Sequence, residues 1–85
     1  MISKRRDKSE WEEGYLNNVW CKFKTFLSPD GDLYVVARRD ATIRVFRLKK
    51  KVVEEHKDEE LNHVMKFAEE VSKIPKFIPK DIFEE

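Results

Sequence analysis

The side chains in this sequence that are able to do acid–base or metal chemistry gather around two histidines. His56 and His63 are seven residues apart, so they would share one face of a helix, and Glu55, Glu59 and Glu60 are their neighbours. General acid–base pairs and metal sites use these residue types. However, the sequence contains no HExxH motif and no paired CxxC spacing. We therefore interpret both histidines as exposed polar residues, and we predict no catalytic residue, no metal site and no cofactor.

The single cysteine and the two glycines argue against two further kinds of enzyme. A nucleophilic thiol needs a base and an exposed position, whereas Cys21 falls on the apolar face of a predicted strand. Gly14 and Gly31 are too few and too far apart to form a glycine-rich phosphate loop. We expect a non-enzymatic protein. A lone cysteine cannot form an internal disulfide, which favours a reducing cytoplasm.

The remaining chemistry is recognition of a nucleic acid by rings and cations that alternate along one face of a sheet. Aromatic rings stack on unpaired bases, and lysine or arginine contacts phosphates. We predict RNA rather than DNA as the partner, although no RNP, KH or zinc-knuckle motif is present. The predicted nucleic-acid-binding residues are Trp20, Lys22, Lys24, Tyr34, Arg38, Arg39, Arg44, Phe46, Arg47, Lys49, Lys50 and Lys51.

The same residue types also suit a protein partner. Tryptophan, tyrosine and arginine are enriched at the energetic centres of protein–protein interfaces. The alternative to RNA binding is therefore an inhibitor or adaptor that binds a protein with no nucleic acid involved. The two roles are compatible, because a small protein can use RNA to help hold a protein target.

The stretch that positions these residues, 20–51, is predicted to form a three-stranded antiparallel meander. Successive side chains of a strand point to opposite faces, and ten odd-numbered residues on the three candidate strands share one phase, of which nine are apolar. The odd face, which we expect to be the core face, comprises Val19, Cys21, Phe23, Thr25, Leu27, Leu33, Val35, Ala37, Ile43 and Val45. The even positions mix rings with cations. The turns are expected at 28–32, which contains Ser-Pro-Asp-Gly-Asp, and at 39–42.

Flanking helices are expected on both sides of the meander. Ser9 and Glu12 have the spacing of a capping box, and Trp11 and Tyr15 are four residues apart, which favours a helix over residues 10–17. The alternative reads Asn17-Asn18 as the turn of a first hairpin, with residues 13–16 as an extra strand.

After the meander, a second helix is predicted from an N-cap at Asp58 to its end before Pro75, with its apolar stripe covering the odd face. The stripe comprises Leu61, Val64, Met65, Ala68 and Val71. The predicted fold is a single small α+β domain of order αβββα. Residues 1–8 form a basic arm, 9–74 the domain and 75–85 a proline-containing tail. We expect the apolar residues of the tail to pack on the domain's own core, the alternative being a tail that binds a partner.

Length and charge further limit the number of domains and the kinds of partner that we expect. Its 85 residues suffice for one domain, and 41% of them are charged. Residues 1–51 carry 13 basic and 7 acidic side chains, whereas residues 52–85 carry 5 and 10, which favours a basic docking surface in the first part. No apolar run reaches about 18 residues and no signal peptide is present, so we expect no membrane partner. A homodimer would cover the second sheet face.

Two resemblances extend these expectations. The element order αβββα, followed by Lys49-Lys50-Lys51, resembles the double-stranded RNA-binding domain, whereas the acidic residues that follow at 54–60 depart from it. The small size, the richness in lysine, glutamate and aromatic residues and the lack of a catalytic motif resemble small accessory proteins of T4-like phages. Some of those inhibit host defence factors such as RNA-cleaving toxins. This resemblance implies an antitoxin-like inhibitor in the cytoplasm, of the host cell if the protein is viral.

Overall fold

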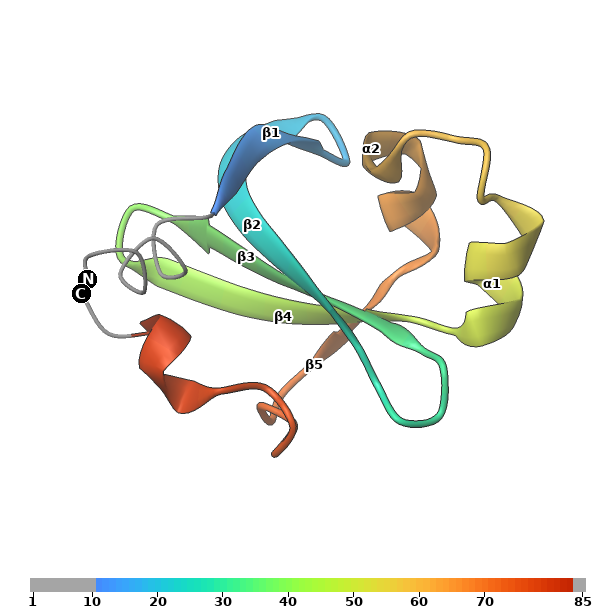
Figure 1. Ribbon diagram of the computed structural model, residues 1–85. Helices are drawn as coiled ribbons and strands as arrows, with labels where there is room; N and C mark the ends of the chain where they lie inside the picture. Colours follow the sequence, from blue (N-terminus) through green and yellow to red (C-terminus); the bar gives the residue numbers. More distant parts are fainter. Residues whose placement is uncertain (1–10, 84–85) are drawn as a thin grey trace, which may run out of the picture.

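The protein is a five-stranded antiparallel sheet with short helices on one face and a C-terminal segment on the other (Figure 1). The computed structural model describes residues 11–83. In sheet order the strands are β1 (Glu12–Leu16), β2 (Val19–Leu27), β3 (Leu33–Arg39), β4 (Thr42–Leu48) and β5 (Glu69–Val71). Between β4 and β5 lie α1 (Lys50–Glu55), α2 (Leu61–Val64) and the 3-10 turn η2 (Met65–Phe67), and η3 (Lys80–Phe83) follows β5. The predicted basic arm at 1–8 lies outside the described residues, as does Ser9.

The helix predicted at residues 10–17 is wrong, and the alternative hairpin is confirmed. Strand β1 pairs with β2 in antiparallel register, and Leu16 lies opposite Val19. Asn17 and Asn18 form the two-residue turn, with φ angles of 53° and 69°. Two-residue hairpin turns of this kind need positive φ at both central positions, and asparagine tolerates that conformation better than most residues. Turn chemistry therefore overrides the helical spacing of Trp11 and Tyr15.

The long helix predicted between Asp58 and Pro75 is also wrong. Helix α2 begins after Glu60 and ends at Val64, and η2 then leads into the short strand β5. The chain extends there because the free edge of β4 has backbone groups to pair and arginines to neutralise. Side chains of Glu69 and Glu70 on β5 form ion pairs with Arg47 and Arg44 on β4, at 2.9 Å and 3.5 Å.

These two corrections overturn the αβββα prediction and the three-stranded meander. The element order is four strands, two short helices with a 3-10 turn, and a fifth strand. The likeness to the double-stranded RNA-binding domain rested on an opening helix before the first strand and a long closing helix, and residues 11–83 contain neither. The resemblance in element order is therefore lost.

The predicted odd face holds for β2 and β3 but is wrong for β4. In the β2–β3 hairpin odd residues face odd residues, as in Phe23 opposite Ala37. Across the two-residue turn between Arg39 and Thr42, odd residues face even ones, so Val36 lies opposite Val45. Residues directly opposite in an antiparallel pair lie on the same side of the sheet. Ile43 and Val45 therefore lie on the same face as the even-numbered residues of β3. Arg44 and Phe46 lie on the same face as the odd-numbered residues of β2 and β3.

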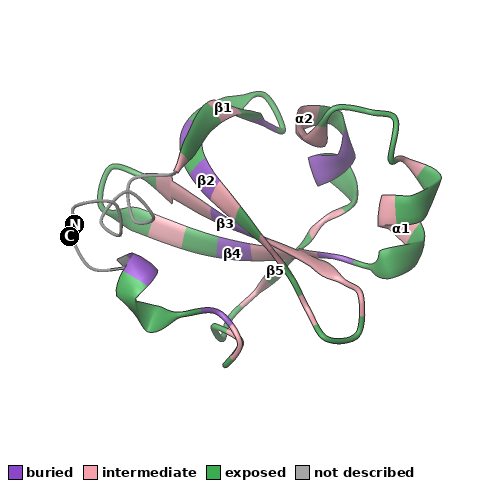
Figure 2. Cartoon of the chain, viewed as in Figure 1, coloured by how far each residue is buried: buried purple, intermediate pink, exposed green. Residues whose placement is uncertain are grey.

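The reversal gives the sheet a core on each face, which we name by what covers it. The helix-covered face carries buried Leu16, Cys21, Phe23, Val35 and Leu48, packed beneath Val64 and Met65. The tail-covered face carries buried Val36 and Val45, packed beneath Ile78 and Ile82, with Phe77 and Trp11 at the edge. Figure 2 shows buried positions both along the strands and in the C-terminal segment.

The packing of the two faces tests what was expected of the apolar stripe and of the tail. The apolar residues Leu61, Val64, Met65 and Ala68 do cover the odd face of β2 and β3. Val71, the fifth residue of the predicted stripe, lies on β5 and packs on the tail-covered face instead. The tail packs on the domain's own core through Phe77, Ile78 and Ile82, as expected. The argument for a homodimer rested on an uncovered second face, and that argument no longer applies.

Among residues 11–83, no helix is long and apolar enough to cross a membrane.

Candidate nucleic-acid interface

Two large rings stand exposed at the end of the tail-covered face. Tyr15 on β1 lies directly opposite Trp20 on β2, next to the Asn17-Asn18 turn. Their ring centroids are 5.0 Å apart in an edge-to-face arrangement, and the residues are 56% and 53% exposed. Edge-to-face contact holds both rings in a fixed orientation. More than half of the surface of each residue is nevertheless open to solvent, which leaves the rings accessible for stacking.

A pair of cations continues this face next to the rings. Lys22 follows Trp20 on the same side of β2, and Arg38 on β3 lies directly opposite Lys22. Like charges directly opposite in a sheet destabilise it. Glu13, on the other side of Lys22, offsets part of this repulsion. Lys22 makes no ion pair with any residue in the described part of the chain.

Trp11 forms the border between this surface and the tail-covered core. Its half-buried ring packs against the Val36 and Val45 cluster. The Nζ of Lys24 lies 6.0 Å from the ring centroid, and the Cζ of Arg38 lies 5.8 Å from it. Cation–π contacts of this kind help to hold a charged side chain in place. We name the four residues Tyr15, Trp20, Lys22 and Arg38 the aromatic–basic surface.

A shallow hollow of about 530 Å³ adjoins the aromatic–basic surface. Its lining includes Trp20, Lys22 and Arg38 from that surface, together with Arg39. Glu13 and Asp40 are the acidic residues in it, so its three cations exceed its two carboxylates. A concave, basic surface with an exposed ring is suited to a charged chain with planar groups.

No protein-family model, curated protein or solved structure matches this chain. The assignment of a site therefore rests on geometry alone.

The structure brings together only some of the predicted nucleic-acid-binding residues. Trp20, Lys22, Lys24 and Arg38 share one face, as expected from their spacing on β2 and β3. Tyr34 is on that face too, but the ring of Phe77 packs on it edge to face at 5.1 Å. Phe46 lies on the helix-covered face, because the two-residue turn reverses β4.

The arginines of β4 are held by β5. Arg44 lies on the helix-covered face opposite Ala37 and forms an ion pair with Glu70. Arg47 donates a hydrogen bond to Glu69 at 2.9 Å. Hydrogen bonds to Glu69 and to Tyr34 raise the pKa of Arg47 further above its ordinary value. Both arginines thus help to pair the strands, and neither lies on the aromatic–basic surface.

The lysine cluster 49–51 lies at the opposite end of β4 from the Asp40-Ala41 turn. Lys49 is the N-cap residue of α1, and Lys50 and Lys51 form its first turn. Because β4 has seven residues, roughly 20 Å of strand separates them from that turn. These lysines add to the positive field of the molecule but do not adjoin Trp20 or Lys22 in the sheet.

His56 and Cys21 make structural contacts, and His63 is exposed. The ring of His56 stacks on that of Phe67, with 4.7 Å between the ring centroids. Nδ1 of His56 lies 2.7 Å from Oε2 of Glu59, and the hydrogen bond between them lowers the pKa of Glu59. His63 lies on α2 rather than on a shared helix face with His56. Cys21 is buried in the helix-covered core. No group of three or more metal-ligating side chains occurs among residues 11–83.

Sequence reasoning missed Tyr15, which it placed on a helix. The signal that would have found it is the dipeptide Asn17-Asn18. A two-residue turn there sets Tyr15 opposite Trp20, because residues two positions away from the turn on each side form a pair.

Proposed function

We propose that this protein binds single-stranded RNA through the aromatic–basic surface and does so without catalysing a reaction. Trp20 and Tyr15 stack on unpaired bases, and Lys22 and Arg38 contact the phosphates that link them. The observation that carries the proposal is the adjacency of an exposed ring pair to a cross-strand pair of cations on one face.

The folding energetics support a role for this surface in binding. Two exposed rings gain little stability for the fold, because more than half of the surface of each residue stays in water. Lys22 and Arg38 lie directly opposite each other, so a polyanion on this face would meet two cations at once.

Single-stranded RNA fits this surface better than a duplex does. Bases in a duplex are stacked on each other and are not available to Trp20. Unpaired bases in RNA loops and single strands can splay out onto aromatic side chains. Each stacked base contributes about 1–3 kcal/mol.

The test is a fluorescence-anisotropy titration of a labelled single-stranded RNA at 50 and 200 mM salt, with Trp20→Ala and Lys22→Gln beside the unaltered protein. We expect Trp20→Ala to weaken binding by roughly 5- to 100-fold, as the loss of one stacked base predicts. Lys22→Gln should weaken binding and flatten the dependence on salt, since each phosphate contact contributes a log–log slope of about −0.7 for single strands.

Matched variants lie on other elements. Phe67→Ala removes an exposed ring beside α2, and Lys57→Gln removes an exposed charge after α1, so both should bind RNA as the unaltered protein does. Equal binding of single-stranded DNA would broaden the partner to single strands in general. Absence of binding at 50 mM salt, or full binding by Trp20→Ala, would overturn the proposal and favour a protein partner for the rings.

A further inference from the structure

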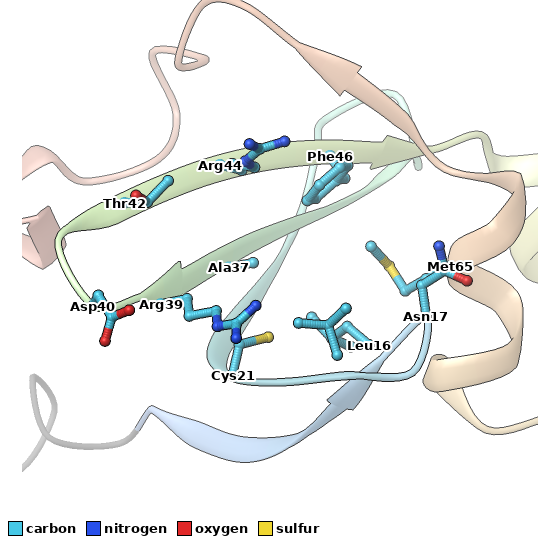
Figure 3. A pocket seen from close by; sticks show the side chains of 11 residues that line it. Leu16, Asn17, Cys21, Ala37, Arg39, Asp40, Thr42, Arg44, Phe46 and Met65 are labelled. Atoms are coloured by element: carbon cyan, nitrogen blue, oxygen red, sulfur yellow. The ribbon is translucent and has the colours of Figure 1, made fainter.

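The helix-covered face is only partly covered. Helix α2 and the turn η2 reach the sheet through Val64 and Met65, and they stop beside Leu16 at the end of β1. Beyond them, between the β1–β2 hairpin and β4, the sheet leaves a pocket of about 460 Å³ (Figure 3). Pockets for small molecules typically enclose about 300–1,000 Å³, so this one is large enough to hold a ligand.

The pocket has an apolar lining and a polar rim. The apolar lining is Leu16, Val19, Cys21, Ala37, Phe46 and Met65. The rim is Asn17, Arg39, Asp40, Thr42 and Arg44. An apolar interior with a few polar groups at its border is the usual composition of a small-molecule site. The separation of the two parts calls for a ligand that is apolar at one end and polar at the other.

Arg39 indicates that the polar end of the ligand carries a negative charge. Its side chain extends toward the sulfur of Cys21 (Figure 3), while Asp40 and Arg44 add one charge of each sign to the rim. Burial raises the pKa of the Cys21 thiol, and the charge of Arg39 opposes that rise. Arg39 forms no ion pair within the described part of the chain, while Arg44 is paired with Glu70. Of the two arginines that line the pocket, Arg39 is therefore the one that can pair with the charged group of a ligand.

We infer that this pocket binds a small amphipathic organic anion, with an acyl or aryl body on Phe46, Ala37 and Met65 and an anionic head paired with Arg39. The inference does not depend on RNA binding, because Tyr15, Trp20, Lys22 and Arg38 do not line this pocket, although Arg39 and Asp40 line both the pocket and the hollow beside the aromatic–basic surface. A guanidinium offers two parallel donors to a carboxylate, sulfonate or phosphate, which fixes the orientation of the head.

The probe for this chemistry is anilinonaphthalene sulfonate, an aryl anion whose fluorescence rises in apolar surroundings. We expect saturable binding of one probe molecule per chain. Decanoate should displace it, whereas decanol, which has the same body without the charge, should displace it poorly. Equal displacement by decanol would overturn the anionic requirement, and displacement by inorganic phosphate alone would overturn the apolar one.

Two variants address the two ends of the ligand separately. Arg39→Gln should weaken probe binding about tenfold or more, as the loss of a charged hydrogen-bond partner predicts. Val19→Phe should also weaken binding by narrowing the pocket, and its side chain is exposed enough to be replaced without overpacking the core. Lys73→Gln, which removes an exposed charge after β5, is the matched control and should bind normally. Unchanged binding by both Arg39→Gln and Val19→Phe would refute the assignment.

Cys21 supplies a second readout that separates pocket binding from partial unfolding. A ligand in the pocket shields the sulfur, so the rate of alkylation by iodoacetamide should fall as decanoate or the probe is added. If the probe instead bound to a loosened core, alkylation would accelerate with its concentration. Acceleration would therefore overturn the proposal even if fluorescence rose.

Discussion

At the scale of single residues, two asparagines determine how the first third of the described chain folds. Asn17 and Asn18 both have left-handed φ angles, and the backbone N–H groups of both donate to Asn62, one to its carbonyl at 3.2 Å and one to its Oδ1 at 2.6 Å. The turn is thus fixed by its own conformation and by a contact with α2. The pairing of Tyr15 with Trp20 depends on this turn, because a different loop length would shift the register.

Asn18→Val should destabilise the protein by about 1–2 kcal/mol, since a β-branched residue is strained at positive φ. Asn18→Gly should change stability by no more than about 0.5 kcal/mol, because glycine adopts this conformation freely. Urea unfolding followed by tryptophan fluorescence compares the two variants directly. Equal midpoints for valine and glycine would mean that the hairpin does not need this backbone geometry.

At the scale of elements, α1 is held by a residue from another part of the chain. The helix has six residues and no side-chain cap from its own N-cap residue, Lys49. The carboxylate of Asp32, in the β2–β3 loop, accepts the N–H of Lys50 at 2.9 Å instead. Three lysines at the positive end of a helix are unfavourable, and a carboxylate there offsets them. The loop is positioned by Ser28, whose Oγ accepts the N–H of Asp32 at 3.0 Å.

Asp32→Ala should therefore cost about 0.5–2 kcal/mol, the usual range for the loss of a helix cap. Asp30→Ala, in the same loop, is the matched control and should lie within about 0.5 kcal/mol of the unaltered protein, as exposed substitutions usually do. Thermal unfolding followed by circular dichroism gives both values. A loss of equal size in the two variants would indicate an effect of loop charge rather than of capping.

Element by element, the sequence predicts strands more reliably than it predicts their mutual orientation. The alternation of apolar residues correctly placed β2 and β3, with Phe23 and Val35 on one buried face. Val45 is buried as well, but on the opposite side of the sheet, because the number of residues in a turn decides which parity continues across it. The number of residues in this turn is hard to predict from the sequence Arg39-Asp40-Ala41-Thr42. Arg44 and Phe46 were assigned to the wrong face of the sheet for this reason.

The second predicted helix was too long for a related reason. Residues 61–71 carry apolar positions at helical spacing, but Glu69 and Glu70 find better partners in the arginines of β4 than a continued helix would offer. Such a contact joins residues more than 20 positions apart, as Arg47 and Glu69 illustrate. Local periodicity contains no information about it.

At the scale of the whole molecule, stability is divided between two cores on opposite faces of one sheet. Val35 and Val36 are adjacent in sequence, both have no exposed surface, and each belongs to a different core. The second core exists only because the segment after β5 crosses the sheet and inserts Ile78 and Ile82. Between residues 72 and 83 that segment contributes one turn and η3 but no strand, so its attachment depends on side-chain burial.

Ile78→Ala should destabilise the protein by about 2–5 kcal/mol, the range for truncating a buried isoleucine. Ile78 is 1% exposed, whereas Ile74 is 46% exposed, so Ile74→Ala is a control of identical chemistry and should lie within about 0.5 kcal/mol of the unaltered protein. Urea midpoints measure the difference. A small effect at Ile78 would mean that the segment is not packed on Val36 and Val45.

The segment at 77–82 crosses the tail-covered face, and this arrangement also sets an order of events in folding. Hairpins between neighbouring strands form within about 1–10 μs, because their ends are close in sequence. The segment at 77–82 has nowhere to pack until β3 and β4 are aligned, so we expect it to dock after the rate-limiting step. The release of this segment would then be the first event of unfolding. Stopped-flow measurements on Ile78→Ala should accordingly show a faster unfolding rate and a nearly unchanged folding rate.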